Sequence, residues 1–159
     1  MTLDIIERFI TISSEAPAAG APCYLIRFSG CNLRCPYCDT PRGDTITYTL
    51  TPDELYKDII RRLAHYPSLK ILFTGGEPLL GERQTLLYDI IHRCRGSADF
   101  YIETNGSIPI KQFPGHTHFI CDWKTPSSGE EKKFVSENLK HLRPGADCIK
   151  FVLAKDDFP

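Results

Sequence analysis

Apolar residues along the chain form short continuous runs that alternate with longer stretches of helical spacing. Helical spacing predicts helices at residues 82–94 and 130–142, and a third helix that begins at Thr51. The continuous runs predict five strands, at residues 22–29, 69–74, 99–103, 118–122 and 148–153. Strands that alternate with helices indicate an α/β fold with a parallel sheet. Five strands do not close a barrel, so we expect an open, partial parallel β/α barrel.

The helix that begins at Thr51 carries a capping signature. Pro52 follows in the first helical position, and Glu54 stands three residues after Thr51, as in a capping box. The next apolar residues recur every four positions and so share one face of the helix: Leu55, Ile59 and Leu63.

Residues with unusual side chains follow four of the predicted strands. A cysteine-rich loop follows the first strand, and residues 75–78 (GGEP), 103–106 (ETNG) and 122–124 (DWK) follow the next three. Active sites of parallel α/β proteins lie at the carboxyl ends of the strands. The positions of these residues therefore predict one shared site.

Composition limits the class of protein. A length of 159 residues fits a single domain over residues 1–159, and 42% apolar and 25% charged residues are ordinary for a globular chain. A net charge of −1 gives no strong attraction to nucleic acid or to an anionic membrane. No apolar run is long enough to span a bilayer, and Asp4, Glu7 and Arg8 argue against a signal peptide. We expect a cytoplasmic protein.

The chain has seven cysteines, and three of them lie within eight residues, as Cys31, Cys35 and Cys38. Their spacing is C-x3-C-x2-C, and clustered cysteines in a reducing compartment indicate metal or redox chemistry. Three thiolates on one loop can hold three irons of a [4Fe–4S] cluster, which leaves the fourth iron open to a cofactor. An electron delivered there can cleave a bound sulfonium such as S-adenosylmethionine.

A structural zinc site is the alternative, with His116 or His118 as the fourth ligand. The remaining cysteines fall on predicted strands or helix faces and are expected to be small buried apolar residues: Cys23, Cys94, Cys121 and Cys148.

The cysteine motif, with Tyr37 before its last cysteine, and the Gly-Gly-Glu-Pro stretch together resemble the radical S-adenosylmethionine superfamily. The resemblance implies that Gly75, Gly76 and Glu77 line the methionine amino group of the cofactor, and that Tyr37 also contacts the cofactor. Glycines allow close backbone approach, and a carboxylate accepts from an ammonium. A strand–helix turn that needs glycine only for its geometry is the alternative.

Further segments resemble one family, the 7-carboxy-7-deazaguanine synthases, from about residue 5 to the end. These segments are residues 26–27 (IR), 38–40 (CDT), 74–78 (TGGEP), 103–106 (ETNG), 122–129 (DWKTPSSG) and 149–152 (IKFV). The resemblance implies conversion of 6-carboxy-5,6,7,8-tetrahydropterin to 7-carboxy-7-deazaguanine and ammonia. It also implies catalytic S-adenosylmethionine, a magnesium ion, a homodimer and an electron donor of the flavodoxin or ferredoxin type.

The resemblance further assigns roles to individual residues. Arg27, Thr74 and Glu15 match substrate contacts, and Thr40 matches the magnesium ligand; a guanidinium suits the substrate carboxylate and a hydroxyl suits Mg²⁺. Cofactor contacts are expected from Thr104, Asn105, Asp122 and Lys124. The alternatives are an edge salt bridge for Arg27, local backbone bonds for Thr40 and a plain strand-end hydroxyl for Thr74. For Thr104 and Asn105 the alternative is a plain Asn-Gly turn, and for Lys124 it is a solvated lysine. Trp123 is expected to serve packing.

Two departures from the family pattern concern the substrate. The family has Gln-Gly-Glu-Gly where this chain has Ser13-Ser14-Glu15-Ala16, so only the glutamate is kept. Residues 156–159 resemble the start of a further helix or loop, and the resemblance implies that the last part of the family's domain is absent.

Two rival functions use the same cysteines. A small activase that makes a glycyl radical in a partner protein would fit the length, but it fits Asp39-Thr40 and residues 126–129 poorly. A non-catalytic iron–sulfur or zinc module would not need Gly75 to Pro78. Cleavage of S-adenosylmethionine separates the module from the enzymes, and the substrate separates the two enzymes.

Overall fold

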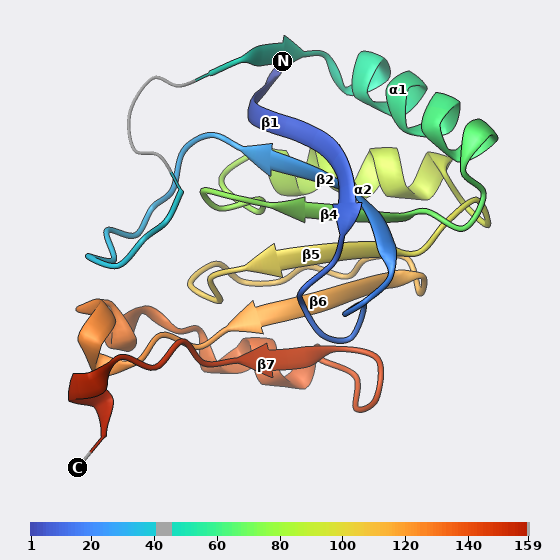
Figure 1. Cartoon of the computed structure of the whole chain (residues 1–159). Coiled ribbons are helices and arrows are strands. Elements are labelled where there is room, and N and C mark those ends of the chain that lie inside the picture. The colour runs from blue at the N-terminus through green and yellow to red at the C-terminus, as the bar shows by residue number, and fades with distance from the viewer. Residues whose placement is uncertain (41–45, 159) are drawn as a thin grey trace.

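The computed structural model describes residues 1–40 and 46–158. Within this part, the strands form one seven-stranded sheet in the order β3-β1-β2-β4-β5-β6-β7 (Figure 1). The parallel strands are β2 (Pro22–Phe28), β4 (Lys70–Thr74), β5 (Phe100–Thr104), β6 (Thr117–Asp122) and β7 (Cys148–Lys150). These are the five predicted strands, although β7 is shorter than expected. The strands β3 and β7 form the two edges, so the sheet stays open, as a partial barrel requires.

Two antiparallel strands were not predicted. Strand β1 (Leu3–Ile12) pairs with β2, and β3 (Tyr48–Leu50) pairs with β1. Regular alternation in β1 is broken because both Ile5 and Ile6 are buried, at a β-bulge that shifts the register between Ile5 and Glu7. A bulge places two consecutive side chains against one partner residue, and this hides the period of two.

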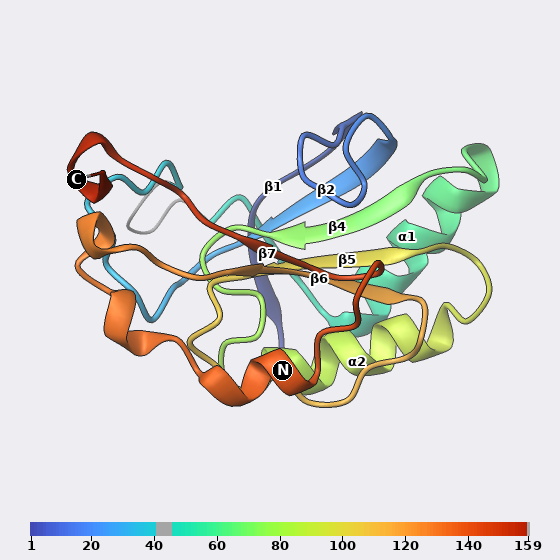
Figure 2. The same ribbon diagram turned by 90° about the horizontal axis from the view of Figure 1, so that it is seen from below.

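The two predicted helices nearest the middle of the chain are confirmed. Helix α1 (Pro52–His65) begins with a capping box, in which the Glu54 amide donates to Thr51 Oγ1 (3.2 Å) and the Thr51 amide donates to Glu54 Oε2 (2.8 Å). Helix α2 is Arg83–Arg93. Both helices pack on one face of the sheet, and Figure 2 shows α2 on the opposite side from the loop that joins β1 to β2.

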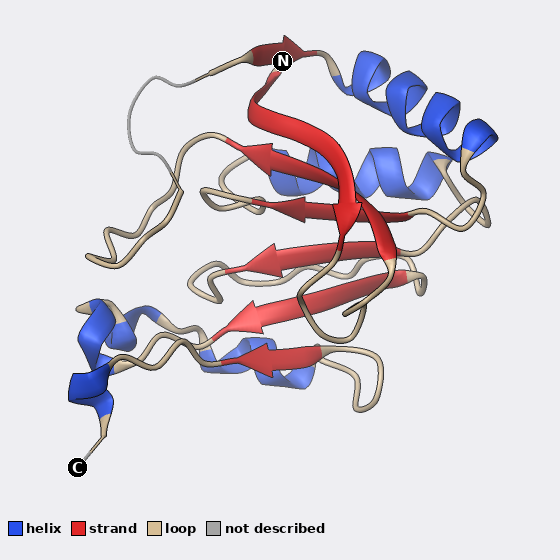
Figure 3. Cartoon of the chain, viewed as in Figure 1, coloured by secondary structure: helices blue, strands red, loops and turns tan. Residues whose placement is uncertain are grey.

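The helix predicted at residues 130–142 is wrong. The chain there forms two short 3₁₀ segments, Glu131–Lys133 and Ser136–Lys140 (Figure 3). Phe134 is extended between them and stacks on Trp123, with ring centroids 4.2 Å apart. The Asn138 side chain is buried and bonds the backbone of Gly106, Ile108 and Ile110. Contacts of Phe134 and Asn138 with distant residues therefore take the place of the expected helix.

No helix in the described ranges is long and apolar enough to cross a membrane.

The C-terminal segment is held to the loop after β6 by Asp157. Its carboxylate accepts from the Ser127 amide (2.9 Å), Ser127 Oγ (2.6 Å) and Thr125 Oγ1 (3.0 Å), and from the Ala154 amide (2.8 Å). These bonds, above all that from the Ser127 hydroxyl, lower the pKa of Asp157 to about 2. The carboxylate is therefore ionised at neutral pH and accepts all four hydrogen bonds. The stabilisation that these bonds give is lost as pH falls below the usual pKa of Asp toward 2.

Replacing Asp157 by alanine is expected to free the C-terminal segment from the loop after β6. The Ser127 amide loses its acceptor and should exchange with deuterium faster, while strands β4 and β5 keep their protection. Asp156→Ala is the matched control, since Asp156 is the exposed neighbour. Equal exchange at Ser127 in both variants would show that Asp157 does not hold the loop.

Candidate active site

The sheet has one face covered by helices and one face that lines a cavity. Every second residue along the strands packs against α1 and α2, and these residues include Ile26, Phe73 and Ile102. Because strand side chains alternate between faces, the residues between and after these point the other way. At the carboxyl ends of the strands, this second face presents Arg27, Thr74, Glu103, Asp122 and Lys150. All five line one cavity of about 470 Å³.

All three cysteines of the loop after β2 line this cavity. Cys35 is buried, whereas Cys31 and Cys38 are exposed. The Leu33 amide and the Asn105 side-chain amide donate to Cys31 Sγ, at 3.4 and 3.5 Å. Burial raises the pKa of the Cys35 thiol, so a bound cation is needed to hold it as a thiolate near neutral pH.

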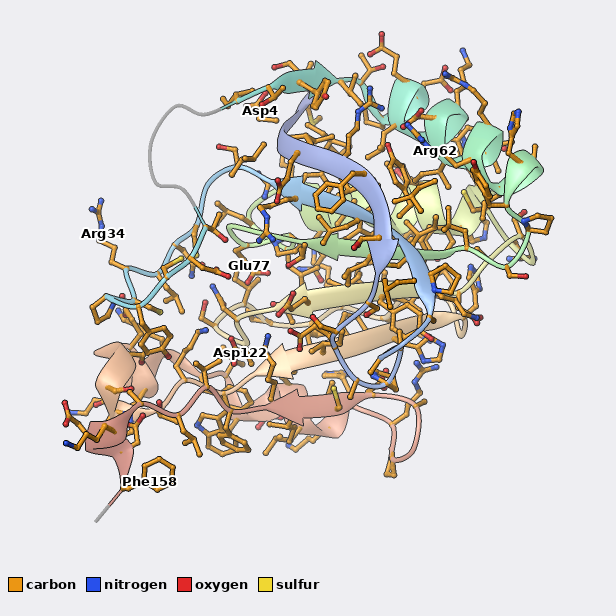
Figure 4. All side chains as sticks on the ribbon, viewed as in Figure 1. Asp4, Arg34, Arg62, Glu77, Asp122 and Phe158 are labelled. Carbon is orange, nitrogen blue, oxygen red and sulfur yellow. The ribbon has the colours of Figure 1, made fainter. Side chains whose placement is uncertain are left out.

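The cysteine loop is braced by the loops that follow other strands. The Asn105 side chain donates to Asn32 Oδ1 (3.1 Å), and Asn32 donates to Ser107 Oγ (2.7 Å). On the far side, the Arg34 amide donates to Glu130 Oε1 (2.7 Å). Figure 4 shows the Arg34 side chain pointing away from the sheet, so its backbone carries the contact.

The glycine pair after β4 touches both the cysteine loop and Arg27. A Cβ on Gly76 would lie 2.1 Å from the carbonyl oxygen of Gly30, and one on Gly75 would lie 1.9 Å from Arg27 Cγ. The Glu77 amide donates to the same Gly30 carbonyl (2.8 Å). Both glycines have positive φ, so only glycine permits this approach without strain.

Glu77 is fully buried and does not line the cavity. Its Oε1 accepts from the Leu79 amide (2.9 Å) and Thr104 Oγ1 (2.8 Å), and its Oε2 accepts from the Asn105 amide (2.7 Å). Burial raises the pKa of Glu77 against these hydrogen bonds. In this structure the carboxylate fixes Thr104 and Asn105, which both line the cavity. Its expected contact with a cofactor ammonium stays a prediction.

Arg27 and Thr40 meet at the rim of the cavity. One terminal nitrogen of Arg27 donates to Thr40 Oγ1 (3.2 Å), and Arg27 Nε donates to Glu7 Oε1 (2.6 Å). The edge salt bridge that was the alternative for Arg27 therefore exists, but the guanidinium also lies in the lining of the cavity.

Glu103 and Lys150 form a charged network and are site residues that the sequence did not predict. Lys150 Nζ contacts Glu103 Oε1 and lies 3.5 Å from Glu15 Oε2, and Thr74 Oγ1 donates to Glu103 (2.6 Å). The predicted contacts Glu15 and Thr74 thus belong to one network. Burial alone raises the pKa of Glu103, but Lys150 and Thr74 outweigh it and leave this pKa below its usual value. The available signal was strand alternation, which puts both residues on the open face.

Removing the Lys150 charge is expected to reverse the pH dependence of stability. Glu103 now stabilises the fold above its usual pKa, and this contribution is lost as pH falls. In Lys150→Met, burial would raise the Glu103 pKa, so stability should decrease as pH rises, with a total loss of about 3 kcal/mol near neutral pH.

Thermal melting between about pH 5 and 8 checks this expectation, with Lys140→Met as the control. Lys140 pairs with Glu137 on the surface, so its loss should change little. A Lys150→Met protein with the same pH profile as the parent would contradict the proposed pairing.

Asp122, Lys124 and Tyr37 form a second group in the lining of the cavity. Lys124 donates to Asp122 Oδ2 and lies 5.9 Å from the Tyr37 ring centroid. Burial lowers the pKa of Lys124, but Asp122 raises it above its usual value. Among the described residues, Asp122 Oδ1 and the Tyr37 hydroxyl are buried without a hydrogen-bond partner. Figure 4 labels Asp122 and Glu77 at the carboxyl ends of the central strands. These orphaned atoms are suited to a polar ligand.

The histidines considered for zinc lie at the other end of the sheet. His118 is near the start of β6, stacks on Tyr101 and bonds the Ala146 carbonyl (2.9 Å). His116 precedes β6 and bonds the Ile91 carbonyl (3.4 Å). Neither histidine is near the cysteine loop, which follows the carboxyl end of the parallel strand β2.

The other four cysteines serve packing, as expected, with one exception. Cys23, Cys94 and Cys121 are buried, and burial raises the pKa of Cys94 to about 11 and that of Cys121 to about 12. Cys148 is only half-buried and donates to the Ala16 carbonyl (3.1 Å).

Three thiols on one loop are the donor set that an iron–sulfur cluster uses, although no three ligating side chains in the described part of the chain are already arranged as a metal site. Three thiols, a glycine turn packed against the cysteine loop, and the orphaned Asp122 and Tyr37 atoms all border the same cavity. The predicted site residues lie in its lining, apart from Glu77: Glu15, Arg27, Cys31, Cys35, Tyr37, Cys38, Thr40, Thr74, Gly75, Gly76, Thr104, Asn105, Asp122 and Lys124.

Comparison with known proteins agrees with the fold and identifies the family. The model of the Radical SAM superfamily matches residues 25–114. A 7-carboxy-7-deazaguanine synthase from Methanospirillum hungatei is 34% identical over 157 residues, covering 98% of this chain and 63% of that protein. One from Clostridium acetobutylicum is 33% identical over 159 residues, covering 97% and 70%.

A solved structure, "Crystal structure of QueE from Escherichia coli", has the same fold. The TM-score is 0.74 at 23% identity, and the match covers 98% of this chain and 73% of that one.

The fold and the site define a protein of the Radical SAM superfamily, whose members use S-adenosylmethionine and a [4Fe–4S] cluster. Within that superfamily, the chain belongs to the family of the 7-carboxy-7-deazaguanine synthases. It spans 63% of the length of the Methanospirillum relative and 70% of the Clostridium one.

Proposed function

We propose that this chain is a radical S-adenosylmethionine lyase that converts 6-carboxy-5,6,7,8-tetrahydropterin into 7-carboxy-7-deazaguanine and ammonia. One observation carries the proposal: the cavity that contains Cys31, Cys35 and Cys38 also contains a row of half-buried charged side chains. Along the strand ends, this row runs from Arg27 through Glu103 to Lys150. Such a row suits a small, flat, polar molecule that carries a carboxylate.

Each group of the row has a counterpart in the substrate. Arg27 offers a planar fork of donors for the carboxylate. Glu15 and Glu103 offer acceptors for the N–H groups of the pterin ring, while Lys150 prevents the two carboxylates from repelling each other. The Thr74 hydroxyl donates a hydrogen bond to Glu103, and it would orient the pterin ring from the side of the sheet.

A second group of lining residues would hold the cofactors. Cys31, Cys35 and Cys38 would bind the cluster, and Asp122, Tyr37, Thr104 and Asn105 would bind S-adenosylmethionine. When bound, the cluster and S-adenosylmethionine would supply the reversible hydrogen-atom transfer at C6 of the substrate that the ring contraction needs. Thr40, beside Arg27, would bind Mg²⁺ through its hydroxyl.

We also propose the electron donor, the oligomeric state, the location and the domain organisation of the enzyme. A flavodoxin or ferredoxin type of donor would supply the electron, the chain would act as a cytoplasmic homodimer, and residues 1–159 would form one domain.

The test is an anaerobic assay of the reconstituted protein with dithionite, S-adenosylmethionine, Mg²⁺ and the pterin. Mass spectrometry follows 7-carboxy-7-deazaguanine, with 5′-deoxyadenosine measured alongside. We expect the deazaguanine from the parent protein and none from Arg27→Ala. Deoxyadenosine alone would contradict the pterin assignment and favour the activase, and neither product from an intact cluster would favour a binding module.

A further inference from the structure

Glu7 does not line the cavity, yet it contacts the residue that faces the proposed substrate carboxylate. Its Oε1 accepts from Arg27 Nε at 2.6 Å. The Glu7 side chain is 43% exposed and that of Arg27 is 21% exposed. Exposed ion pairs add little to stability, so this contact calls for another explanation.

The β-bulge of β1 is what brings Glu7 to Arg27. Before the bulge Ile5 pairs with Phe28, and after it Glu7 pairs with Arg27. With regular pairing from Ile5 onward, Glu7 would stand opposite Ile26, whose side chain lies in the core on the other face. The extra residue of the bulge, between Ile5 and Glu7, therefore turns Glu7 to the face of the sheet that carries Arg27. Bulges commonly re-aim a side chain next to an active site.

Two further elements fix Arg27 from other sides. Gly75 leaves room for its aliphatic part, because a Cβ there would lie 1.9 Å from Arg27 Cγ. Thr40, on the loop of the cysteines, accepts from one terminal nitrogen at 3.2 Å. A guanidinium has five N–H donors, and these two bonds use only part of them.

We propose that Glu7 is a positioning residue that holds Arg27 through Nε, so that the terminal nitrogens of the guanidinium face an anionic group of the substrate. This inference rests on the proposed function, in which that group is the pterin carboxylate. Glu7 acts only through Arg27 and does not touch the substrate.

The test is equilibrium binding of 6-carboxytetrahydropterin by calorimetry, on anaerobically reconstituted protein with S-adenosylmethionine and no reductant. Glu7→Ala should weaken binding about tenfold, as for the loss of a hydrogen bond between charged groups. Arg27→Ala should weaken it about a hundredfold, as for the removal of a buried charge partner. Glu7→Gln keeps an acceptor for Nε and should stay within about threefold of the parent.

The double variant gives the decisive comparison. If Glu7 acts through Arg27, then Glu7→Ala combined with Arg27→Ala binds no more weakly than Arg27→Ala alone. Glu137→Ala, which breaks the exposed pair with Lys140, should bind like the parent. Losses that multiply in the double variant, or a lower melting temperature with unchanged affinity in Glu7→Ala, would overturn the proposal.

Binding is measured without turnover, so it separates the two claims. A parent protein that binds the pterin but forms no deazaguanine would contradict the proposed reaction and leave the role of Glu7 measurable. A parent protein that does not bind the pterin would overturn both.

Discussion

Replacing Cys35 by alanine is expected to abolish the iron–sulfur cluster and every activity that depends on it. Two remaining thiolates cannot hold three irons, and the described residues place neither His116 nor His118 near the loop to substitute. The reconstituted variant should lack the visible absorption of the cluster, bind far less iron and form no 5′-deoxyadenosine.

The matched control for Cys35→Ala is Cys148→Ser. Cys148 is half-buried, lies outside the cavity lining, and donates a hydrogen bond that serine can reproduce. This variant should keep both iron and activity. Equal iron content in the two variants would contradict the assignment of Cys35 as a ligand.

Replacing Glu77 by alanine is expected to cause the second large effect. The change leaves the Leu79 amide, the Asn105 amide and the Thr104 hydroxyl without their acceptor in a buried site. Each unsatisfied buried donor costs about 1–3 kcal/mol, so the expected loss of stability is at least about 3 kcal/mol. Because Thr104 and Asn105 line the cavity, binding of S-adenosylmethionine should weaken as well.

Chemical denaturation and cofactor binding check this prediction. Glu77→Gln is the informative companion, since it keeps the volume and one carbonyl acceptor but turns an NH₂ group toward a donor. The stability of Glu77→Gln and its affinity for S-adenosylmethionine should lie between those of the parent and those of Glu77→Ala. A Glu77→Ala protein as stable as the parent would show that the carboxylate does not organise residues 104–105.

The parallel part of the fold could be predicted from the sequence because its signals are local. Continuous apolar runs mark strands that are buried on one face by helices and partly buried on the other, and a capping box marks the start of α1. The position of the site followed from the rule that strand carboxyl ends meet at one edge. The motif around the three cysteines then supplied the chemistry.

The parts that were missed depend on contacts between distant residues. The bulge in β1 hides its alternation, and only pairing with β2 reveals why Glu7 faces Arg27. The helix predicted at 130–142 is replaced by contacts of Phe134 and Asn138 with Trp123 and the loop after β5. Lys150 looks like an ordinary strand lysine until the sheet places it beside Glu103.

The most direct test of the account is electron paramagnetic resonance of the reduced, reconstituted protein with and without S-adenosylmethionine. We expect the signal of a reduced [4Fe–4S] cluster whose g values change when S-adenosylmethionine is added, since three cysteines leave one iron without a protein ligand. A protein that takes up zinc in place of iron, or a cluster signal that S-adenosylmethionine does not alter, would contradict the account.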